Sequence, residues 1–279
     1  MARQLARAIH GVALIGAAIG IAQCDRSGTA VTPASDPEIL QPAEEGAMPS
    51  PRPLLGRSDL LAAVAAAASD TAGGVVRRGP SGLDGRQFRL RIAFGCQGEN
   101  APPPGINAPR DGVPRRSRPA DKANLRLSLS PADWSDGDPS GPAPLGFDSM
   151  EGVWITRPWM MGEGCPTSGL PVPDPGVARP GPRVGLAMLR AEGASRLGRA
   201  GSGDFSYLVR GQTDAPAPDP ANGYRLVIEG RLMAWGDGRV IRCQVIRADE
   251  PPSCAIGASV DKIAFEDAAG AGLSDWRLN

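Results

Sequence analysis

Short segments in which apolar and polar residues alternate run from residue 84 to residue 279. Alternation with a period of two is typical of strands that bury one face, and no helical period lies between these segments. Loops rich in proline and glycine separate them. The sequence therefore predicts a mainly β domain over residues 84–279, an antiparallel β-sandwich or small barrel of about eight strands. The predicted strands are RQFRLRIAF (86–94), NLRLSLS (124–130), GVWITRPW (152–159), RVGLAMLR (183–190), DFSYLVRG (204–211), YRLVIEGRLMAW (224–235), RVIRCQVIR (239–247) and VDKIAFED (260–267).

The clearest predicted strand pairing joins the sixth and seventh of these segments. Asp237-Gly238 is a dipeptide that accepts the two positive φ angles of a tight hairpin turn. A two-residue turn here pairs Trp235 with Val240 and Leu232 with Cys243. That register gathers small and apolar side chains on one face, so we expect it in preference to a three-residue turn. The residues that would share the buried face are Leu232, Ala234, Ile241, Cys243 and Val245.

One short alanine-rich helix precedes the β domain. Within residues 58–74, SDLLAAVAAAASDTAGG, Ser58 or Asp59 can cap the start, and Gly73 and Gly74 can end the helix. We therefore predict a helix over residues 59–71. The preceding segment, residues 24–57, is rich in proline and has almost no apolar periodicity, so it cannot bury enough surface to offset the entropy of ordering. It is predicted to be a disordered tether.

The first 23 residues have the pattern of an export signal. Arg3 and Arg7 precede a run of twelve small or apolar residues, Gly11 to Ala22, and no acidic residue interrupts this stretch. A helix that crosses a bilayer needs about 20 apolar residues, so this run is too short for a permanent span. We interpret residues 1–23 as a signal peptide that is removed.

The end of this segment resembles the lipobox of bacterial lipoproteins. In that pattern an aliphatic residue and small residues precede a cysteine, as Ile21 and Ala22 precede Cys24 here, although Gln23 departs from the small residue usual at its position. The resemblance implies that Cys24 is acylated and becomes the mature N-terminus. The membrane is then a partner through this lipid, and the protein lies on the periplasmic face of a bacterial membrane. Ordinary cleavage after Ala22 is the alternative, and it gives a soluble periplasmic or secreted protein.

The cysteine count agrees with an oxidising compartment. When Cys24 is set aside, Cys96, Cys165, Cys243 and Cys254 remain, and four cysteines can form two disulfides. Three connectivities are possible. We favour Cys243 with Cys254, which are eleven residues apart across a turn, and therefore Cys96 with Cys165. No CxxC pair and no neighbouring histidine occur, which argues against a metal site.

Composition excludes several kinds of function. Lysine and arginine number 30, as do aspartate and glutamate, so the chain has no net charge to attract nucleic acid. The only histidine, His10, lies in the predicted signal peptide, which leaves no Ser-His-Asp or Cys-His nucleophile. No cofactor motif is present. The remaining catalytic hypothesis is a carboxylate-dependent hydrolase acting on cell-wall or polysaccharide substrate through Glu151, Glu163 or Glu229.

Two features suggest binding instead of catalysis. A proline-rich loop carries Arg115, Arg116 and Arg118, which suit an anionic lipid or phosphate. Trp159 and Trp235 lie near predicted strand ends and are expected to be exposed, where they could stack on sugar rings. We therefore expect a non-catalytic binding or structural β domain of the cell envelope, with an envelope glycan or protein as partner. The biochemical activity does not follow from the sequence.

Overall fold

A computed structural model of the chain describes residues 52–75, 82–96, 110–119, 123–134, 147–167, 183–191, 204–212, 214–218 and 220–278. Contacts divide the chain into two units, Met1–Pro49 and Ser50–Asn279, and every described residue belongs to the second. The predicted signal peptide, Cys24 and almost all of the predicted tether therefore lie outside the described residues.

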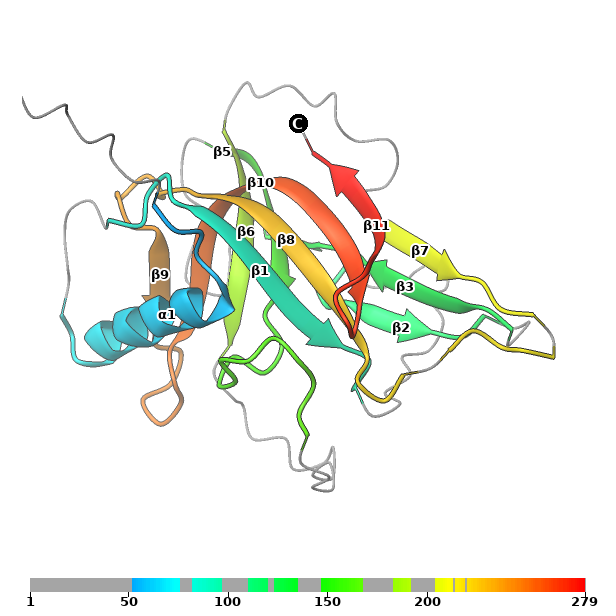
Figure 1. Cartoon of the computed structure of the whole chain (residues 1–279). Coiled ribbons are helices and arrows are strands. Elements are labelled where there is room, and N and C mark those ends of the chain that lie inside the picture. Colours follow the sequence, from blue (N-terminus) through cyan, green and yellow to red (C-terminus); the bar gives the residue numbers. More distant parts are fainter. Residues whose placement is uncertain are drawn as a thin grey trace, which may run out of the picture. The chain divides into compact units, whose positions relative to one another are not determined.

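The described residues form one helix and eleven strands in two sheets (Figure 1). The large sheet has the strand order β1-β8-β10-β6-β5-β4, with β9 and β11 also paired to β10, and the small sheet has the order β2-β3-β7. The mainly β fold is confirmed. The large sheet is not closed on itself, which decides against the barrel. The elements are α1 (Arg57–Ala72), β1 (Gln87–Phe94), β2 (Arg115–Ser117), β3 (Leu125–Leu129), β4 (Ala132–Asp133), β5 (Phe147–Trp154), β6 (Val184–Ala191), β7 (Phe205–Val209), β8 (Tyr224–Leu232), β9 (Ile241–Gln244), β10 (Ser253–Asp267) and β11 (Gly272–Arg277).

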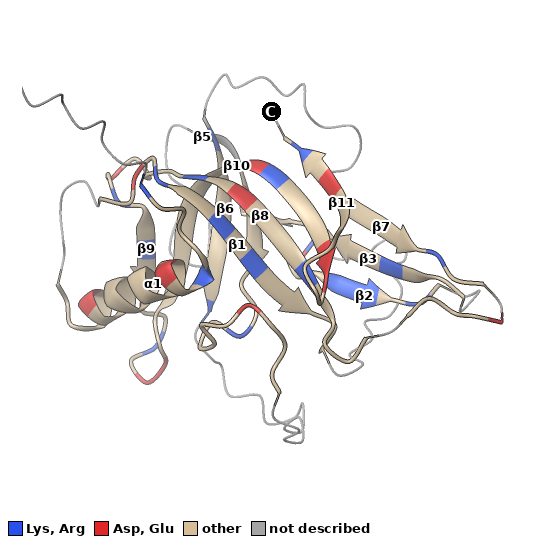
Figure 2. Cartoon of the chain, in the orientation of Figure 1, with Lys and Arg blue, Asp and Glu red and all other residues tan. Residues whose placement is uncertain are grey.

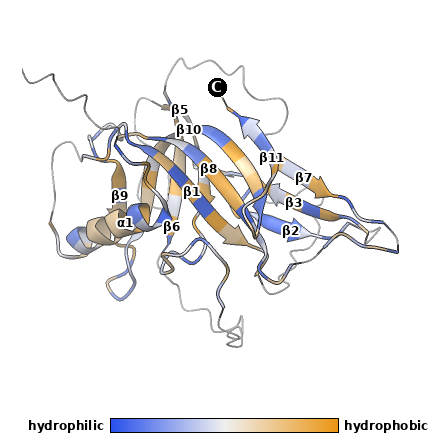
Figure 3. Cartoon of the chain, in the orientation of Figure 1, coloured by the Kyte–Doolittle hydropathy of each residue, from blue (hydrophilic) through white to orange (hydrophobic). Residues whose placement is uncertain are grey.

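The main hydrophobic core lies against one face of the large sheet. Its strands alternate hydrophobic and hydrophilic positions (Figure 3), and β1 buries Phe88, Leu90 and Ile92 while Arg89 and Arg91 point to the other face. The helix α1 and the small sheet both pack on this core, near opposite ends of the large sheet in Figure 1. They contribute Leu60, Leu61 and Val64 from α1 and Leu125, Leu127, Leu129 and Phe205 from the small sheet.

The helix begins slightly earlier than its sequence predicts. It covers Arg57–Ala72, with Gly56 rather than Ser58 or Asp59 at the N-cap position. The Asp59 carboxylate instead accepts a hydrogen bond from the Gly56 amide, at 2.8 Å, so it satisfies one of the amides left open at a helix start. Gly73 ends the helix as predicted.

The predicted hairpin between residues 231 and 245 is wrong. The chain does turn there, since the Trp235 amide donates to the Arg239 carbonyl, but β9 pairs with β10 and not with β8. β10 has 15 residues, enough to pair with β8 along one part and with β9 along the other. Gly257 of β10 bonds to both Met233 and Val240, so β8 and β9 follow each other along the same side of β10. Val245 is consequently exposed.

Two disulfides join the described residues, with the connectivity that the cysteine spacing favoured. Cys243 and Cys254 are directly opposite each other on β9 and β10. Cys96, after β1, bonds to Cys165 in the loop after β5, across 69 residues of sequence. They indicate an oxidising, extracytoplasmic environment.

Candidate functional site

The outer edge of β1 is covered by two separate segments of the chain. Leu55 bridges to Phe88: its amide donates to the Gln87 carbonyl at 3.0 Å, and its carbonyl accepts from the Arg89 amide at 2.9 Å. Further along the same edge, the loop that follows β5 covers β1. An uncovered edge offers unpaired backbone groups to other chains, so this arrangement protects β1 from non-specific pairing.

The Arg57 guanidinium fastens the loop after β5 to this edge. Its Nε donates to the Met160 carbonyl at 3.0 Å, and its Nη2 donates to the carbonyls of Thr156 and Arg157, each at 2.9 Å. A longer bond of 3.4 Å joins Nη1 to the Arg91 carbonyl of β1. The side chain is buried, and burial, followed by the nearby Arg157 charge, lowers the pKa of Arg57 from its ordinary value. One buried cation therefore ties the start of α1, β1 and the loop together.

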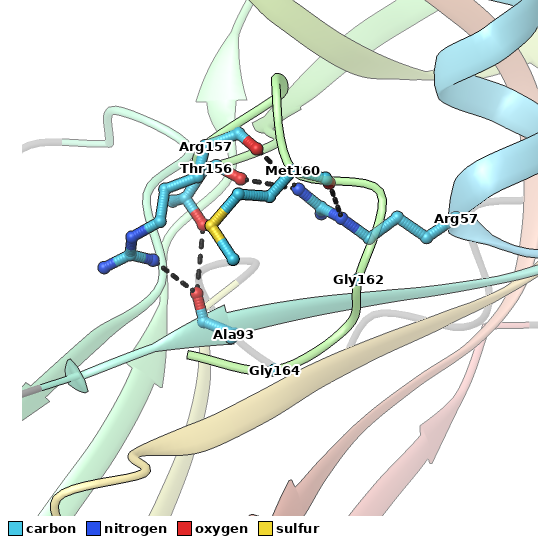
Figure 4. Close-up of a pocket in the computed structure, with 7 residues that line it drawn as sticks. All are labelled: Arg57, Ala93, Thr156, Arg157, Met160, Gly162 and Gly164. Carbon is cyan, nitrogen blue, oxygen red and sulfur yellow. Dashed lines mark hydrogen bonds between the residues drawn. The ribbon is translucent and has the colours of Figure 1, made fainter. Parts of the chain in front are cut away.

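Four further contacts hold the same loop, as Figure 4 shows in part. The Ala93 carbonyl of β1 accepts hydrogen bonds from the Thr156 hydroxyl at 3.0 Å and from the Arg157 guanidinium at 3.2 Å. Arg157 adopts a left-handed backbone with φ of 52°. Glu163 pairs with Arg91 at 3.1 Å, and Cys165 is held by its disulfide. The loop is fixed along its length.

Despite these links, the loop exposes large apolar side chains. Trp159 is 65% exposed and Met161 is 48% exposed, while Leu54, in the segment that covers the other part of the edge, is 52% exposed. These are three of the seven exposed large hydrophobic residues in the described part of the chain. We call residues 52–57 and 155–163 together the β1-edge surface. It also carries Arg52, Arg57 and Arg157 against Glu163.

The hollow drawn in Figure 4 is too narrow to hold a ligand. Its lining residues are Arg57, Ala93, Thr156, Arg157, Met160, Gly162 and Gly164, and the space between them does not admit a water molecule. Ligands of this region would therefore contact the exposed side chains of the β1-edge surface, not an internal pocket.

The face of the large sheet opposite the main core carries an ion-pair network across β1, β8 and β10 (Figure 2). Arg89 contacts Glu266 at 2.7 Å and Glu229 at 3.1 Å, and Arg91 contacts Glu266 at 3.0 Å. Lys262 lies 3.7 Å from Glu229. Burial alone lowers the pKa of Arg91, but hydrogen bonds and charges from Glu266 and Glu163 outweigh it and raise that pKa above its usual value.

The three carboxylates predicted as catalytic candidates all lie in ion pairs. Glu163 and Glu229 belong to the contacts just described, and Glu151 of β5 is buried and pairs with Arg110 at 2.9 Å. These ion pairs give the side chains of Glu151, Glu163 and Glu229 a structural role.

The arginines predicted to form a basic loop are engaged within the domain. Arg115 and Arg116 lie on β2, and Arg118 follows it. Arg115 contacts both oxygens of Asp111; burial alone raises the pKa of Asp111, but hydrogen bonds from Arg115 and from the Val113 amide lower it overall. Arg116 is buried, and Arg118 donates to the Ala217 carbonyl at 3.1 Å. The three do not share one exposed surface.

The two tryptophans predicted to be exposed differ. Trp159 is exposed as expected, but the expectation for Trp235 is wrong, because its side chain is buried in a second apolar cluster with Trp134. The Trp235 indole donates to the Val240 carbonyl at 3.2 Å, and the Arg242 guanidinium lies over its ring.

The contribution of Arg57 and Leu54 to the site was not predicted. No pattern in the sequence marks an arginine at a helix start as the clamp of a distant loop.

Among the described residues, no helix is long and apolar enough to cross a bilayer. That part of the chain also contains no group of three or more histidine, cysteine, aspartate or glutamate side chains arranged to hold a metal ion. Comparisons with protein-family models, curated proteins and solved structures found no match.

Proposed function

We propose that the protein is an exported, lipid-anchored protein of the bacterial cell envelope whose β domain acts by binding. The β1-edge surface is its contact surface. The observation that carries this proposal is the position of Trp159, which is 65% exposed on a loop held by Arg57, Ala93, Glu163 and a disulfide.

A fixed loop with an exposed tryptophan suits binding for an energetic reason. Ordering a mobile loop on contact costs conformational entropy, and a loop that is already held avoids most of that cost. Tryptophan is among the residues that contribute most to binding energy when they become buried at an interface. An exposed Trp159 gains no such burial within the domain itself, so contact with a partner accounts for it.

The cellular location rests on two kinds of support. The disulfides Cys96–Cys165 and Cys243–Cys254 suit an oxidising compartment outside the cytoplasm. The charged and apolar segment before Cys24 supplies a route of export, and the resemblance of residues 21–24 to a lipobox supplies the anchor.

One experiment in intact bacteria tests both parts of this proposal. In the first arm, Cys24→Ser should move the protein from the membrane fraction to the soluble periplasmic fraction. An unchanged membrane fraction in that variant contradicts the lipid anchor.

In the second arm, a photoreactive phenylalanine analogue replaces Trp159 in one sample and Ile246 in a matched control. Ile246 is 60% exposed and lies in the turn between β9 and β10, outside the β1-edge surface. Irradiation should give adducts with an envelope component from position 159 and far fewer from position 246. Equal yields from the two positions would contradict a binding role for this surface.

A further inference from the structure

We infer that the partner of the β1-edge surface is the anionic headgroup layer of the membrane that anchors the chain. This inference rests on the proposed function, because it names the partner class of the same surface. Its consequence is that the domain has a defined orientation, with Trp159 and Met161 inserted between lipid headgroups.

The first support is the place at which the chain enters the domain. Arg52 is the first described residue, and the segment from it to Arg57 is itself part of the β1-edge surface. Any anchor N-terminal to Arg52 is therefore joined to the domain at this surface. Cys24 lies 28 positions before Arg52 in the sequence. A lipid on Cys24 would therefore tether the domain to the bilayer through this surface.

The second support is the chemistry of the exposed side chains. Tryptophan is enriched where a protein meets the boundary between lipid tails and water, because its ring is apolar and its N–H is polar. The β1-edge surface also exposes Met161 and Leu54, which can enter the same layer. Peripheral membrane proteins insert exposed apolar side chains of this kind into the interface.

The third support is charge. The charged side chains of the β1-edge surface that reach solvent are Arg52, Arg157 and the single acidic residue Glu163, whereas Arg57 is buried. Arginine near a bilayer is attracted by anionic headgroups, and its aliphatic stem can lie along the apolar layer while the guanidinium stays in water. Glu163 is also already paired with Arg91, which reduces its repulsion of an anionic surface.

An envelope glycan fits this surface less well. Sugar recognition needs free hydrogen-bonding groups around the stacking aromatic ring, usually in a cleft. Here the carbonyls of Thr156, Arg157 and Met160 accept bonds from Arg57, and the adjacent hollow admits no water molecule. A membrane surface needs no such pocket.

Vesicle binding by the Cys24→Ser chain tests the inference without a contribution from the anchor. The probes are vesicles of phosphatidylglycerol and phosphatidylethanolamine, compared with vesicles of phosphatidylcholine alone. We expect co-sedimentation with the anionic vesicles, weakened about tenfold by Trp159→Ala combined with Met161→Ala, because two interfacial side chains are lost. Ile246→Ala removes an equally exposed apolar side chain elsewhere and should leave binding unchanged.

A second readout locates the contact. Brominated lipids should quench tryptophan emission far more in the Cys24→Ser chain than in its Trp159→Ala variant, since Trp134 and Trp235 are buried and Trp154 and Trp276 are partly buried. All variants share the same N-terminus, so differences between them do not depend on it. Thermal unfolding of each variant checks that the fold is retained, as expected for exposed positions.

The outcomes separate the two proposals. The membrane inference is overturned if the Cys24→Ser chain and its variant with Trp159→Ala and Met161→Ala bind the anionic vesicles equally. It is also overturned if the Cys24→Ser chain binds phosphatidylcholine vesicles as well as it binds anionic ones. If photo-adducts from position 159 contain a glycan or a protein while the vesicles are not bound, the proposed binding role stands and the membrane inference fails. If position 159 gives no more adducts than position 246, the proposed function fails as well.

Discussion

Two glycines on neighbouring strands make room for the indole of Trp134 on the large sheet. A Cβ atom at Gly152 of β5 would lie 2.1 Å from the ring atom Cε2, and one at Gly185 of β6 would lie 2.4 Å from Cη2. Contacts that short do not occur in real structures, so neither position tolerates a side chain while the ring stays in place. Trp154 closes the cluster with an edge contact to Trp134 at 5.3 Å between ring centroids.

The first prediction for single residues concerns Gly152→Ala. The added methyl group must displace a buried indole, and we expect a loss of about 2–3 kcal/mol in the free energy of unfolding, in the range found for overpacked cores. The measurement is the urea midpoint of unfolding. Gly162→Ala is the matched control, because a Cβ there has no atom within 4 Å. Similar midpoints for the two variants would show that Trp134 does not need this space.

Single residues were only partly predictable from the sequence. The pairing of Cys243 with Cys254 followed from their spacing across a proline-rich turn. The burial of Trp235 did not follow from the sequence, because its ring lies against Gly257 of β10. That contact can be recognised only when the register of β10 with its neighbouring strands is known. The burial of Arg116 was missed for the same reason. A charged residue in a proline-rich stretch is usually solvated, and only the packing of β2 buries this side chain.

At the scale of elements, the edge of β1 is completed by residues that belong to no strand. Leu55 pairs with it for one bridge, and side chains from Arg57, Thr156 and Arg157 bind the carbonyls of Arg91 and Ala93. Side-chain donors thus replace the backbone donors of a further strand. They satisfy the acceptors of β1 without offering a new edge.

Arg57→Met tests how much the covering of the β1 edge depends on one guanidinium. Methionine keeps much of the aliphatic volume but leaves the carbonyls of Thr156, Arg157 and Met160 without their donor. We expect a loss of about 2–4 kcal/mol in unfolding free energy, since bonds to a charged group contribute about 1.5–3 kcal/mol each and water can reach part of the loop. Amide hydrogen exchange in residues 155–165 should also accelerate.

Arg247→Met serves as the control for Arg57→Met. The Arg247 side chain is 71% exposed and contacts only the nearby Glu250 among the described residues, so its removal should change stability by less than about 0.5 kcal/mol. A loop whose hydrogen exchange is the same in both variants would mean that the disulfide and Ala93 hold it without Arg57.

Alternation of apolar and polar residues located some long strands but not the short ones. β1, β3, β6, β7 and β8 begin within one residue of their predicted starts. The bounds predicted for two other strands were wrong, because β5 begins at Phe147 instead of residue 152 and β10 begins at Ser253 instead of residue 260. The strands β2 and β4 were missed, since two or three residues carry no period, and β11 was missed because Gly272–Arg277 is mostly polar. The Asp237-Gly238 dipeptide predicted a turn correctly, but a turn signal cannot say which strand the returning chain will join.

For the whole molecule, the two disulfides restrain chain segments of very different length. Cys96–Cys165 spans 69 residues and joins the end of β1 to the loop after β5. Cys243–Cys254 spans eleven residues within a single β hairpin. The unfolded chain regains more entropy when a longer closed segment is released, so the first bond has the larger effect on the unfolded chain.

Removal of each bond separately should show this difference. With loop entropy as the guide, Cys96→Ser with Cys165→Ser should cost about 4 kcal/mol and Cys243→Ser with Cys254→Ser about 3 kcal/mol. Denaturant unfolding of the two double variants measures both values. The first variant should also release the loop that carries Trp159, which hydrogen exchange can follow. A larger loss from the second pair would contradict the entropic explanation.

The overall class was predictable, whereas the topology was not. A mainly β domain with one preceding helix follows from strand periodicity and a single alanine-rich segment. The parallel pairing of β6 with β10, and the position of the small sheet on the core, depend on contacts between segments more than fifty residues apart. Long loops between the strands removed the local constraints that would have linked them.

The long strand β10 sets the order in which this domain can be made. It pairs with β6, β8, β9 and β11, yet it occupies residues 253–267, so a ribosome has synthesised most of the chain before the strand that joins the others exists. Until then β1 and β8 form little more than an isolated pair of strands, which is marginal in water by itself. We therefore expect the domain to fold only after β10 has been synthesised.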